Sequence, residues 1–310
     1  MTAAPLYTDV ADGPPGGQAF WLSTADGVRI RAGLWAGGTE GTVLLLPGRT
    51  EYIEKYGRAA ADLAELGFST LAIDWRGQGL ADRPLADKMS GHVGDFSEYQ
   101  KDLDALLKFA DEQNLPRPYF MLAHSMGGCI GLRGLMRKLP MQAAAFTAPM
   151  WGISMAAWMR PVAIAVSTTA GWFGQAHRYA PGTTAKTYVL EAPFAGNVLT
   201  TDADMYGYMR TQVSVHPDLA LGGPSMGWLH AALSECHTLS LMQAPDTPTL
   251  CALGTSERVV DTTPIHLRMR GWKTGRIDLY PSAEHEIMME TPAMRKRLFD
   301  SVAAHFRSRR

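Results

Sequence analysis

Ser125 stands where the sequence predicts a sharp turn. The apolar run Tyr119–Leu122 leads into Ala123-His124-Ser125-Met126-Gly127-Gly128, and helical periodicity follows. This order predicts a strand that turns directly into a helix, the geometry in which a Gly-x-Ser-x-Gly segment exposes a serine above a parallel sheet. The first glycine of that pattern is replaced here by Ala123, the smallest residue that has a Cβ atom. We therefore expect the Ser125 hydroxyl oxygen to act as a nucleophile.

Two later loops supply the partners that such a serine needs. A serine hydroxyl is a weak nucleophile until a base removes its proton and a third group orients that base. His285 lies in the polar loop Pro281–Glu286, directly after an apolar run that ends at Tyr280. The loop Gly254–Asp261 contains the candidate acids, with Glu257 as the first choice and Asp261 as the second. The chain order of serine, acid and histidine is the one expected for this kind of site.

The elements that must position these residues alternate between strands and helices. Continuous apolar runs predict strands covered on both faces, and they occupy Thr42–Leu46, Ser69–Ile73, Tyr119–Ala123, Ala143–Thr147, Thr249–Leu253 and Arg276–Tyr280. Helical periodicity occupies Tyr56–Leu66, Phe96–Phe109, Ser125–Leu139 and Ala293–Phe306, and a strand pair is expected at Phe20–Leu22 and Val28–Ile30. This order predicts an α/β fold with a mostly parallel central sheet flanked by helices.

The rhythm breaks after Pro149. Residues 150–244 are rich in Trp, Met and Phe and show no strand alternation, so we expect an inserted, mainly helical cap. The core domain is then formed by residues 1–149 and 245–310. Such an insertion lies over the carboxyl ends of the strands, where α/β proteins bind their ligands.

Composition excludes several classes of function. The formal net charge is −1 and no basic stripe is present, so nucleic acid is not an expected partner. The three cysteines are widely spaced, the histidines have no metal-ligand spacing, and neither a metal nor another cofactor is expected. No signal peptide is visible, and the longest apolar stretch, 161–173, is shorter than the ~20 residues of a membrane span. We expect a cytoplasmic protein whose apolar cap contacts a membrane surface.

Five segments together carry a resemblance to the α/β-hydrolase superfamily. They are Leu46-Pro47-Gly48-Arg49-Thr50-Glu51, Ile73-Asp74-Trp75-Arg76-Gly77-Gln78-Gly79, Ala123-His124-Ser125-Met126-Gly127-Gly128, Glu257-Arg258-Val259-Val260-Asp261 and His285-Glu286-Ile287-Met288-Met289-Glu290. Each follows an expected strand. The chain most resembles the monoacylglycerol lipases and bacterial lysophospholipases, and the cap segment Leu221–Trp228 is also similar to the bacterial relatives. The resemblance implies an α/β-hydrolase fold and a serine hydrolase without a cofactor.

The resemblance also implies roles for individual residues. The family acid corresponds to Glu257, although most members have Asp there. The backbone N–H of Met126 and, after the first buried strand, that of Arg49 would form the oxyanion hole. The Arg49 guanidinium would suit a phosphate or carboxylate on the substrate, unless it pairs with Glu51 or another acid. Trp151 and Met155 are further candidates for contact with the substrate.

Hydrolysis of a single-acyl-chain lipid ester, a lysophospholipid or a monoacylglycerol, is the leading hypothesis. A proline-iminopeptidase-like peptidase or an acyltransferase would use the same serine, histidine and acid, and the peptidase would need acidic cap residues to hold an amine. A ligand-binding protein on a hydrolase fold is the alternative outside catalysis. A p-nitrophenyl ester assay with Ser125→Ala as the control distinguishes the enzymes from the binding protein.

Overall fold

A nine-stranded sheet forms the centre of the computed structural model, which describes residues 2–156 and 158–309. The strands lie in the order β1-β2-β3-β5-β4-β6-β7-β8-β9. Pairing is antiparallel from β1 to β5 and parallel from β5 through β4 to β9. The strands are β1 (Thr2–Ala4), β2 (Gln18–Ser23), β3 (Arg29–Trp35), β4 (Thr42–Leu46), β5 (Ser69–Asp74), β6 (Tyr119–His124), β7 (Ala143–Thr147), β8 (Thr249–Gly254) and β9 (Gly275–Tyr280). The expected mostly parallel sheet is confirmed.

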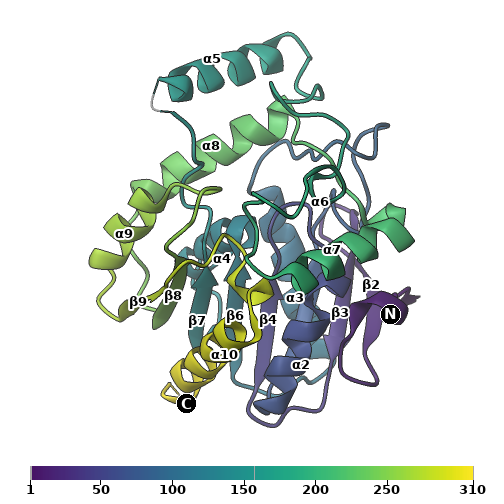
Figure 1. Ribbon diagram of the computed structural model, residues 1–310, viewed down its shortest axis with the longest axis vertical. Coiled ribbons are helices and arrows are strands. Elements are labelled where there is room, and N and C mark those ends of the chain that lie inside the picture. The colour runs from purple at the N-terminus through teal and green to yellow at the C-terminus, as the bar shows by residue number, and fades with distance from the viewer. Residues whose placement is uncertain (1, 157, 310) are drawn as a thin grey trace.

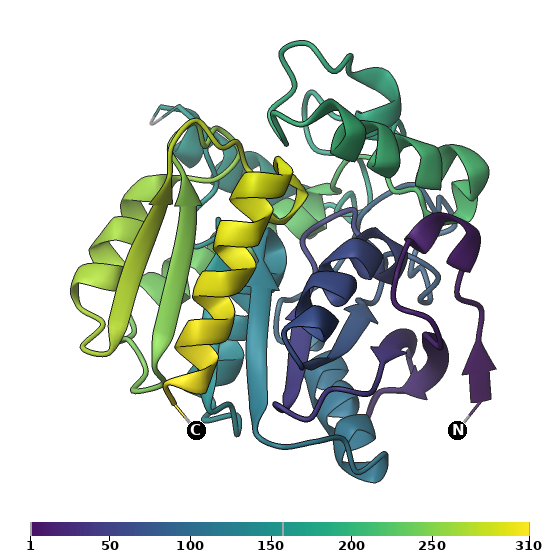
Figure 2. The same ribbon diagram turned by 60° about the horizontal axis from the view of Figure 1, so that its bottom comes forward.

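Helices cover both faces of this sheet because successive side chains of a strand point to opposite sides. Leu44 and Leu46 of β4 pack into one core cluster with α3, α4 and α9, whereas Val43 and Leu45 pack into the other with α2 and α10. Figure 2 shows α10, in yellow, lying across its face of the sheet. The helices are α2 (Gly57–Glu65), α3 (Glu98–Glu112), α4 (Ser125–Met136), α9 (Thr262–Arg270) and α10 (Pro292–Arg307).

Residues 150–244, which we call the cap segment, join β7 to β8 and lie at one end of the sheet (Figure 1). They contain α5 (Met159–Trp172), α6 (Tyr188–Glu191), α7 (Ala203–Val215), the 3-10 helix η2 (Pro217–Leu219) and α8 (Met226–Ser240). Helices α7 and α8 bury side chains in the two core clusters. Helix α5 lies on α8 and has a single buried residue, Ser167. Figure 1 shows α5 on the outer side of α8, away from the sheet.

The short elements escaped the sequence patterns. Strand β1 and helix α1 (Thr8–Ala11) have three and four residues, too few for a period to show. Helix α9 has a mixed sequence with Pro264 near its start and buries only Ile265 and Met269. The 3-10 helices η1 (Ile53–Tyr56) and η3 (Ile287–Met289) follow β4 and β9. In the described ranges, no helix is both long enough and apolar enough to cross a membrane.

Candidate active site

Ser125 lies at the tight turn between β6 and α4. Its φ of 48° is in the left-handed region, which is unfavourable for a residue with a side chain. Two glycines make this turn possible: a Cβ on Gly127 would lie 2.2 Å from the Leu46 carbonyl oxygen, and one on Gly128 would lie 2.6 Å from the Pro149 Cβ. The serine side chain is thereby held at the carboxyl ends of the parallel strands.

His285 connects Ser125 to Glu257. Its Nε2 atom lies 2.9 Å from the Ser125 Oγ atom, and its Nδ1 atom lies 2.7 Å from the Glu257 Oε2 atom. An ionised carboxylate only accepts hydrogen bonds, so Nδ1 carries the proton and Nε2 is free to accept one from the serine hydroxyl. These three side chains therefore form the hydrogen-bonded chain that nucleophilic catalysis requires.

Hydrogen bonds to both side-chain oxygens stabilise Glu257 as a carboxylate. The backbone N–H groups of Val259 and Val260 donate to Oε1 over 2.6 and 3.0 Å, while His285 approaches Oε2. Burial alone would raise the pKa of Glu257, but these hydrogen bonds and the nearby imidazole lower it below its usual value. Asp261 points elsewhere: it caps α9 by accepting from the Thr263 N–H and pairs with Arg160 at 3.5 Å.

The loop after β4 carries Arg49, whose backbone N–H is expected to act together with that of Met126. In the described part of the chain, no acceptor meets the backbone N–H of Arg49 or that of Met126. Gln78 holds the loop on one side, donating to the Gly48 carbonyl oxygen over 2.9 Å and accepting from the Thr50 N–H over 3.1 Å. On the other side the Glu51 carboxylate accepts the Gly48 N–H. The loop is thus fixed on both flanks of Arg49.

The Arg49 side chain corrects one expectation. It does not pair with Glu51, and none of the described residues places a carboxylate within ion-pair distance of it. It donates to the Gly222 carbonyl oxygen over 2.9 Å and lies over the Trp228 ring. Burial lowers the pKa of Arg49 to about 10, so the guanidinium still carries its charge at neutral pH. Glu51 is unavailable to Arg49 because it is engaged by other donors.

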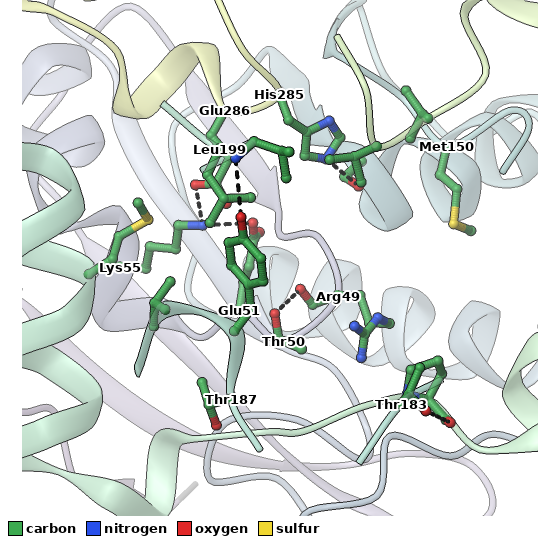
Figure 3. Close-up of a pocket in the computed structure, with 18 of the residues that line it drawn as sticks. Arg49, Thr50, Glu51, Lys55, Met150, Thr183, Thr187, Leu199, His285 and Glu286 are labelled. Carbon is green, nitrogen blue, oxygen red and sulfur yellow. Dashed lines mark hydrogen bonds and ion pairs between the residues drawn. The ribbon is translucent and has the colours of Figure 1, made fainter. Parts of the chain in front are cut away.

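A cavity of about 400 Å³ contains Ser125 and His285 in its wall (Figure 3). Arg49 also lines it, and most of the remaining wall is apolar: Met150, Ile153, Val189, Val198, Leu199, Met209, Val213, Trp228, Leu229, Val259 and Val260. Trp151 and Met155 are not among the lining residues. Trp151 is a core residue instead, because its indole N–H donates to the Gly128 carbonyl oxygen and its ring packs on Phe146.

A buried ionic group beside the cavity was not predicted from the sequence. Lys55 Nζ lies 2.8 Å from a Glu51 carboxylate oxygen and 2.5 Å from one of Glu286. Glu51, His124 and Glu286 offer three potential metal-ligand atoms within 4.8 Å of one another, but Lys55 already supplies the cation there. The only signal in the sequence was that Glu51 and Glu286 stand in the family-like segments next to Arg49 and His285.

His124 and Cys129 have structural surroundings. His124 Nδ1 lies 3.0 Å from the Thr147 carbonyl oxygen and 3.0 Å from the Thr147 Oγ1 atom. Burial lowers the pKa of His124 to about 3. Cys129 is fully buried in α4. The hydrogen bond found for Ser125 Oγ among the described residues is with His285, not with His124 or Cys129.

Comparison with known proteins places this chain in a family. A family model described as "Serine aminopeptidase, S33" matches residues 37–292. "Lysophospholipase L2" of Escherichia coli strain K12 is 36% identical over 277 residues, which cover 85% of this chain and 78% of that protein. The "Monoacylglycerol lipase" of Mycolicibacterium smegmatis is 23% identical over 275 residues, or 85% and 88% of the two chains. Among solved structures, a soluble variant of monoglyceride lipase from Saccharomyces cerevisiae aligns with a TM-score of 0.72 and 20% identity, covering 93% of this chain and 94% of that one.

Proposed function

Because the chain belongs to the family described as "Serine aminopeptidase, S33", and within it to the monoacylglycerol lipase and lysophospholipase group of α/β-hydrolases, we propose that it hydrolyses the ester bond of lysophospholipids. The reaction would proceed through an acyl-enzyme on Ser125. As a member of this group it is a carboxylic ester hydrolase. The observation that carries the proposal is the hydrogen-bonded chain of Ser125, His285 and Glu257 in the wall of a largely apolar cavity.

The positions of these atoms support the following mechanism. Ser125 Oγ attacks the ester carbonyl carbon while His285 Nε2 takes its proton, and Glu257 stabilises the imidazolium that forms. The backbone N–H groups of Met126 and Arg49 bind the oxyanion of the tetrahedral intermediate. The intermediate collapses, His285 gives its proton to the leaving alcohol, and the acyl group remains on the serine. Water, activated by His285, then releases the fatty acid and restores the hydroxyl.

The cavity suits a flexible acyl chain. Its wall is made mainly of aliphatic and methionine side chains, which adapt to chains of different shape. The cavity does not favour the peptidase alternative, because the acidic cap-segment residues Glu191, Asp202, Asp204 and Glu235 do not line it. The carboxylates that do line it, Glu51 and Glu286, are both paired with Lys55.

Arg49 favours a phosphate-bearing lipid over a neutral glyceride. Its guanidinium lies at the cavity wall, and of its five N–H donors one meets a described acceptor, the Gly222 carbonyl oxygen. The remaining donors match the oxygens of a phosphodiester, which an arginine binds through paired hydrogen bonds. A neutral monoacylglycerol would leave this partly desolvated charge without an anion.

We also propose that helix α5 docks on a lipid surface. Its sequence holds one charged residue, Arg160, and no acid. Large apolar side chains are exposed along the helix and at its ends, namely Trp158, Met159, Val162, Ile164, Val166, Trp172 and Phe173. An apolar, weakly cationic helix of fourteen residues suits the interface of an anionic bilayer, where a lysophospholipid resides.

Two variants test the chemistry and the substrate together. A fluorophosphonate probe should label the wild-type protein, and Ser125→Ala should neither be labelled nor hydrolyse any ester. Arg49→Met should lower kcat/KM for a lysophosphatidylethanolamine by about 10- to 100-fold, the effect of about 1.5–3 kcal/mol for a hydrogen bond to a charged group, and lower it much less for the monoacylglycerol with the same acyl chain.

Arg49→Lys is the matched control, because it keeps a cation and should retain part of the preference for phosphate. An equal loss on both lipids in Arg49→Met would remove the phosphate role and leave the hydrolase intact. Unaltered hydrolysis by Ser125→Ala would overturn the hydrolase mechanism itself.

A further inference from the structure

The loop that carries Arg49 and the loop that carries His285 come from distant parts of the sheet. The first follows β4, the second follows β9, and β6, β7 and β8 lie between these strands. Strands β4 and β9 are therefore not paired directly with each other. Catalysis on Ser125 nevertheless needs both at once, since one supplies an oxyanion donor and the other the general base.

Lys55 spans the gap between these loops. Its Nζ atom contacts Glu51, in the loop after β4, over 2.8 Å and Glu286, the residue after His285, over 2.5 Å (Figure 3). Lys55, Glu51 and Glu286 are each at most 5% exposed, so water does not loosen these contacts. The Glu51 carboxylate also accepts the Gly48 N–H within its own loop. At the other end of the bridge, the backbone N–H of Glu286 donates to the Leu199 carbonyl oxygen of the cap segment over 2.8 Å.

Lys55 is paired with more carboxylates than its single positive charge requires. One carboxylate would neutralise Lys55, yet two are buried against it, and the Tyr56 hydroxyl also donates to Glu51. Buried ion pairs add little to stability compared with apolar residues of the same size. A buried ammonium held between two carboxylates is therefore better explained by what it joins than by the stability it contributes.

We propose that Lys55 is a positioning residue that locks the oxyanion loop to the general-base loop through Glu51 and Glu286. This inference rests on the proposed function, because it assigns the bridge to the reaction at Ser125. The bridge keeps the Arg49 N–H and His285 Nε2 at a fixed separation while the substrate carbonyl becomes tetrahedral. Lys55 acts through these groups and does not itself touch the reacting atoms.

Glu286→Leu is the decisive variant. It breaks the bridge at the His285 loop but leaves Lys55 paired with Glu51, so no buried charge loses its last partner. We expect kcat per labelled active site to fall by about 10- to 100-fold, the range that small misplacements of catalytic groups produce, with KM little changed. Glu286→Gln keeps an acceptor oxygen for Lys55 and should recover most of the loss.

Two further variants separate positioning from stability. Glu235→Leu removes a partly buried carboxylate that is paired with Arg133 and does not line the cavity; it should lower the melting temperature and leave kcat per labelled site unchanged. Lys55→Met combined with Glu286→Leu should lose no more in kcat than the worse single variant, as expected for residues that act as one unit.

The bridge is refuted if Glu286→Leu keeps wild-type kcat per labelled site, or if Glu235→Leu loses as much. Fluorophosphonate labelling counts the folded sites in every variant, so a fall in kcat is not mistaken for unfolding. Failure of the bridge leaves labelling and wild-type hydrolysis intact, whereas failure of the proposed function appears as esterase activity that survives in Ser125→Ala.

Discussion

Replacing Glu257 with glutamine tests the role of the acid in atomic detail. Glu257 Oε1 accepts two backbone N–H groups, from Val259 over 2.6 Å and from Val260 over 3.0 Å. In Glu257→Gln the amide oxygen must stay with these donors, which turns the NH₂ group toward His285 Nδ1. The imidazole then accepts at Nδ1 and carries its proton on Nε2, where it can no longer accept the proton of Ser125.

The expected loss is large. A wrong tautomer, together with the loss of the charge that stabilises the imidazolium, lowers kcat by about 10⁴-fold when the triad acid becomes an amide, or about 5 kcal/mol. Asp261→Asn is the matched control, because asparagine caps a helix as well as aspartate and the partly exposed pair with Arg160 is worth about 0–1 kcal/mol. Its kcat should therefore stay near that of the wild type.

Steady-state hydrolysis of a p-nitrophenyl ester at neutral pH measures both variants, and circular dichroism checks that each is folded. Near-normal turnover in Glu257→Gln, together with a large loss in Asp261→Asn, would refute the argument and give the acid role to Asp261. A large loss in both would place Asp261 in the same functional unit as His285, although its described contacts are with Thr263 and Arg160.

Two further predictions concern the cap segment and the buried histidine. Trp172→Ser combined with Phe173→Ser should weaken co-flotation with anionic phospholipid vesicles by about 10-fold or more, since burying each aromatic side chain is worth about 1.5–3 kcal/mol. The same double variant should leave the hydrolysis of a water-soluble ester unchanged. The control is Leu267→Ser, which changes an exposed leucine on α9 and should not affect flotation. Because burial lowers the pKa of His124 to about 3 while an unfolded histidine titrates near 6.5, the unfolded chain takes up a proton first and stability falls as the pH drops below about 6.5. The fall is about 2 kcal/mol at pH ~5, so His124→Gln should show a smaller drop in melting temperature between neutral and acidic buffer; an unchanged drop would mean that His124 is not the group responsible.

The alternation of strands and helices was predictable because the signal is local. The runs at Thr42–Leu46 and Thr249–Leu253 are uniformly apolar, since both of their faces are buried in the structure. The triad candidates were likewise found from their places after strands. Helix α9 was missed because its two buried residues make too weak a period within a mixed sequence.

The ionic bridge and the state of Arg49 were not predictable in the same way. Lys55 meets Glu286 because β4 and β9 run parallel in one sheet, which puts the loops after them at the same end, and no local pattern encodes that meeting. An ion pair with Glu51, two positions away, was one of the two alternatives for Arg49. The carboxylate instead accepts from Gly48, Lys55 and Tyr56, and the Arg49 guanidinium donates to the Gly222 carbonyl oxygen in the cap segment.

The left-handed backbone at Ser125 has a consequence for laboratory evolution of this protein. A φ of 48° costs a residue with a side chain about 1–2 kcal/mol, which glycine would not lose. The substitution that best relaxes this turn is therefore also one that abolishes the hydroxyl. Libraries of this chain that are screened only for expression or heat resistance should enrich inactive glycine variants, so each round needs a selection for turnover as well.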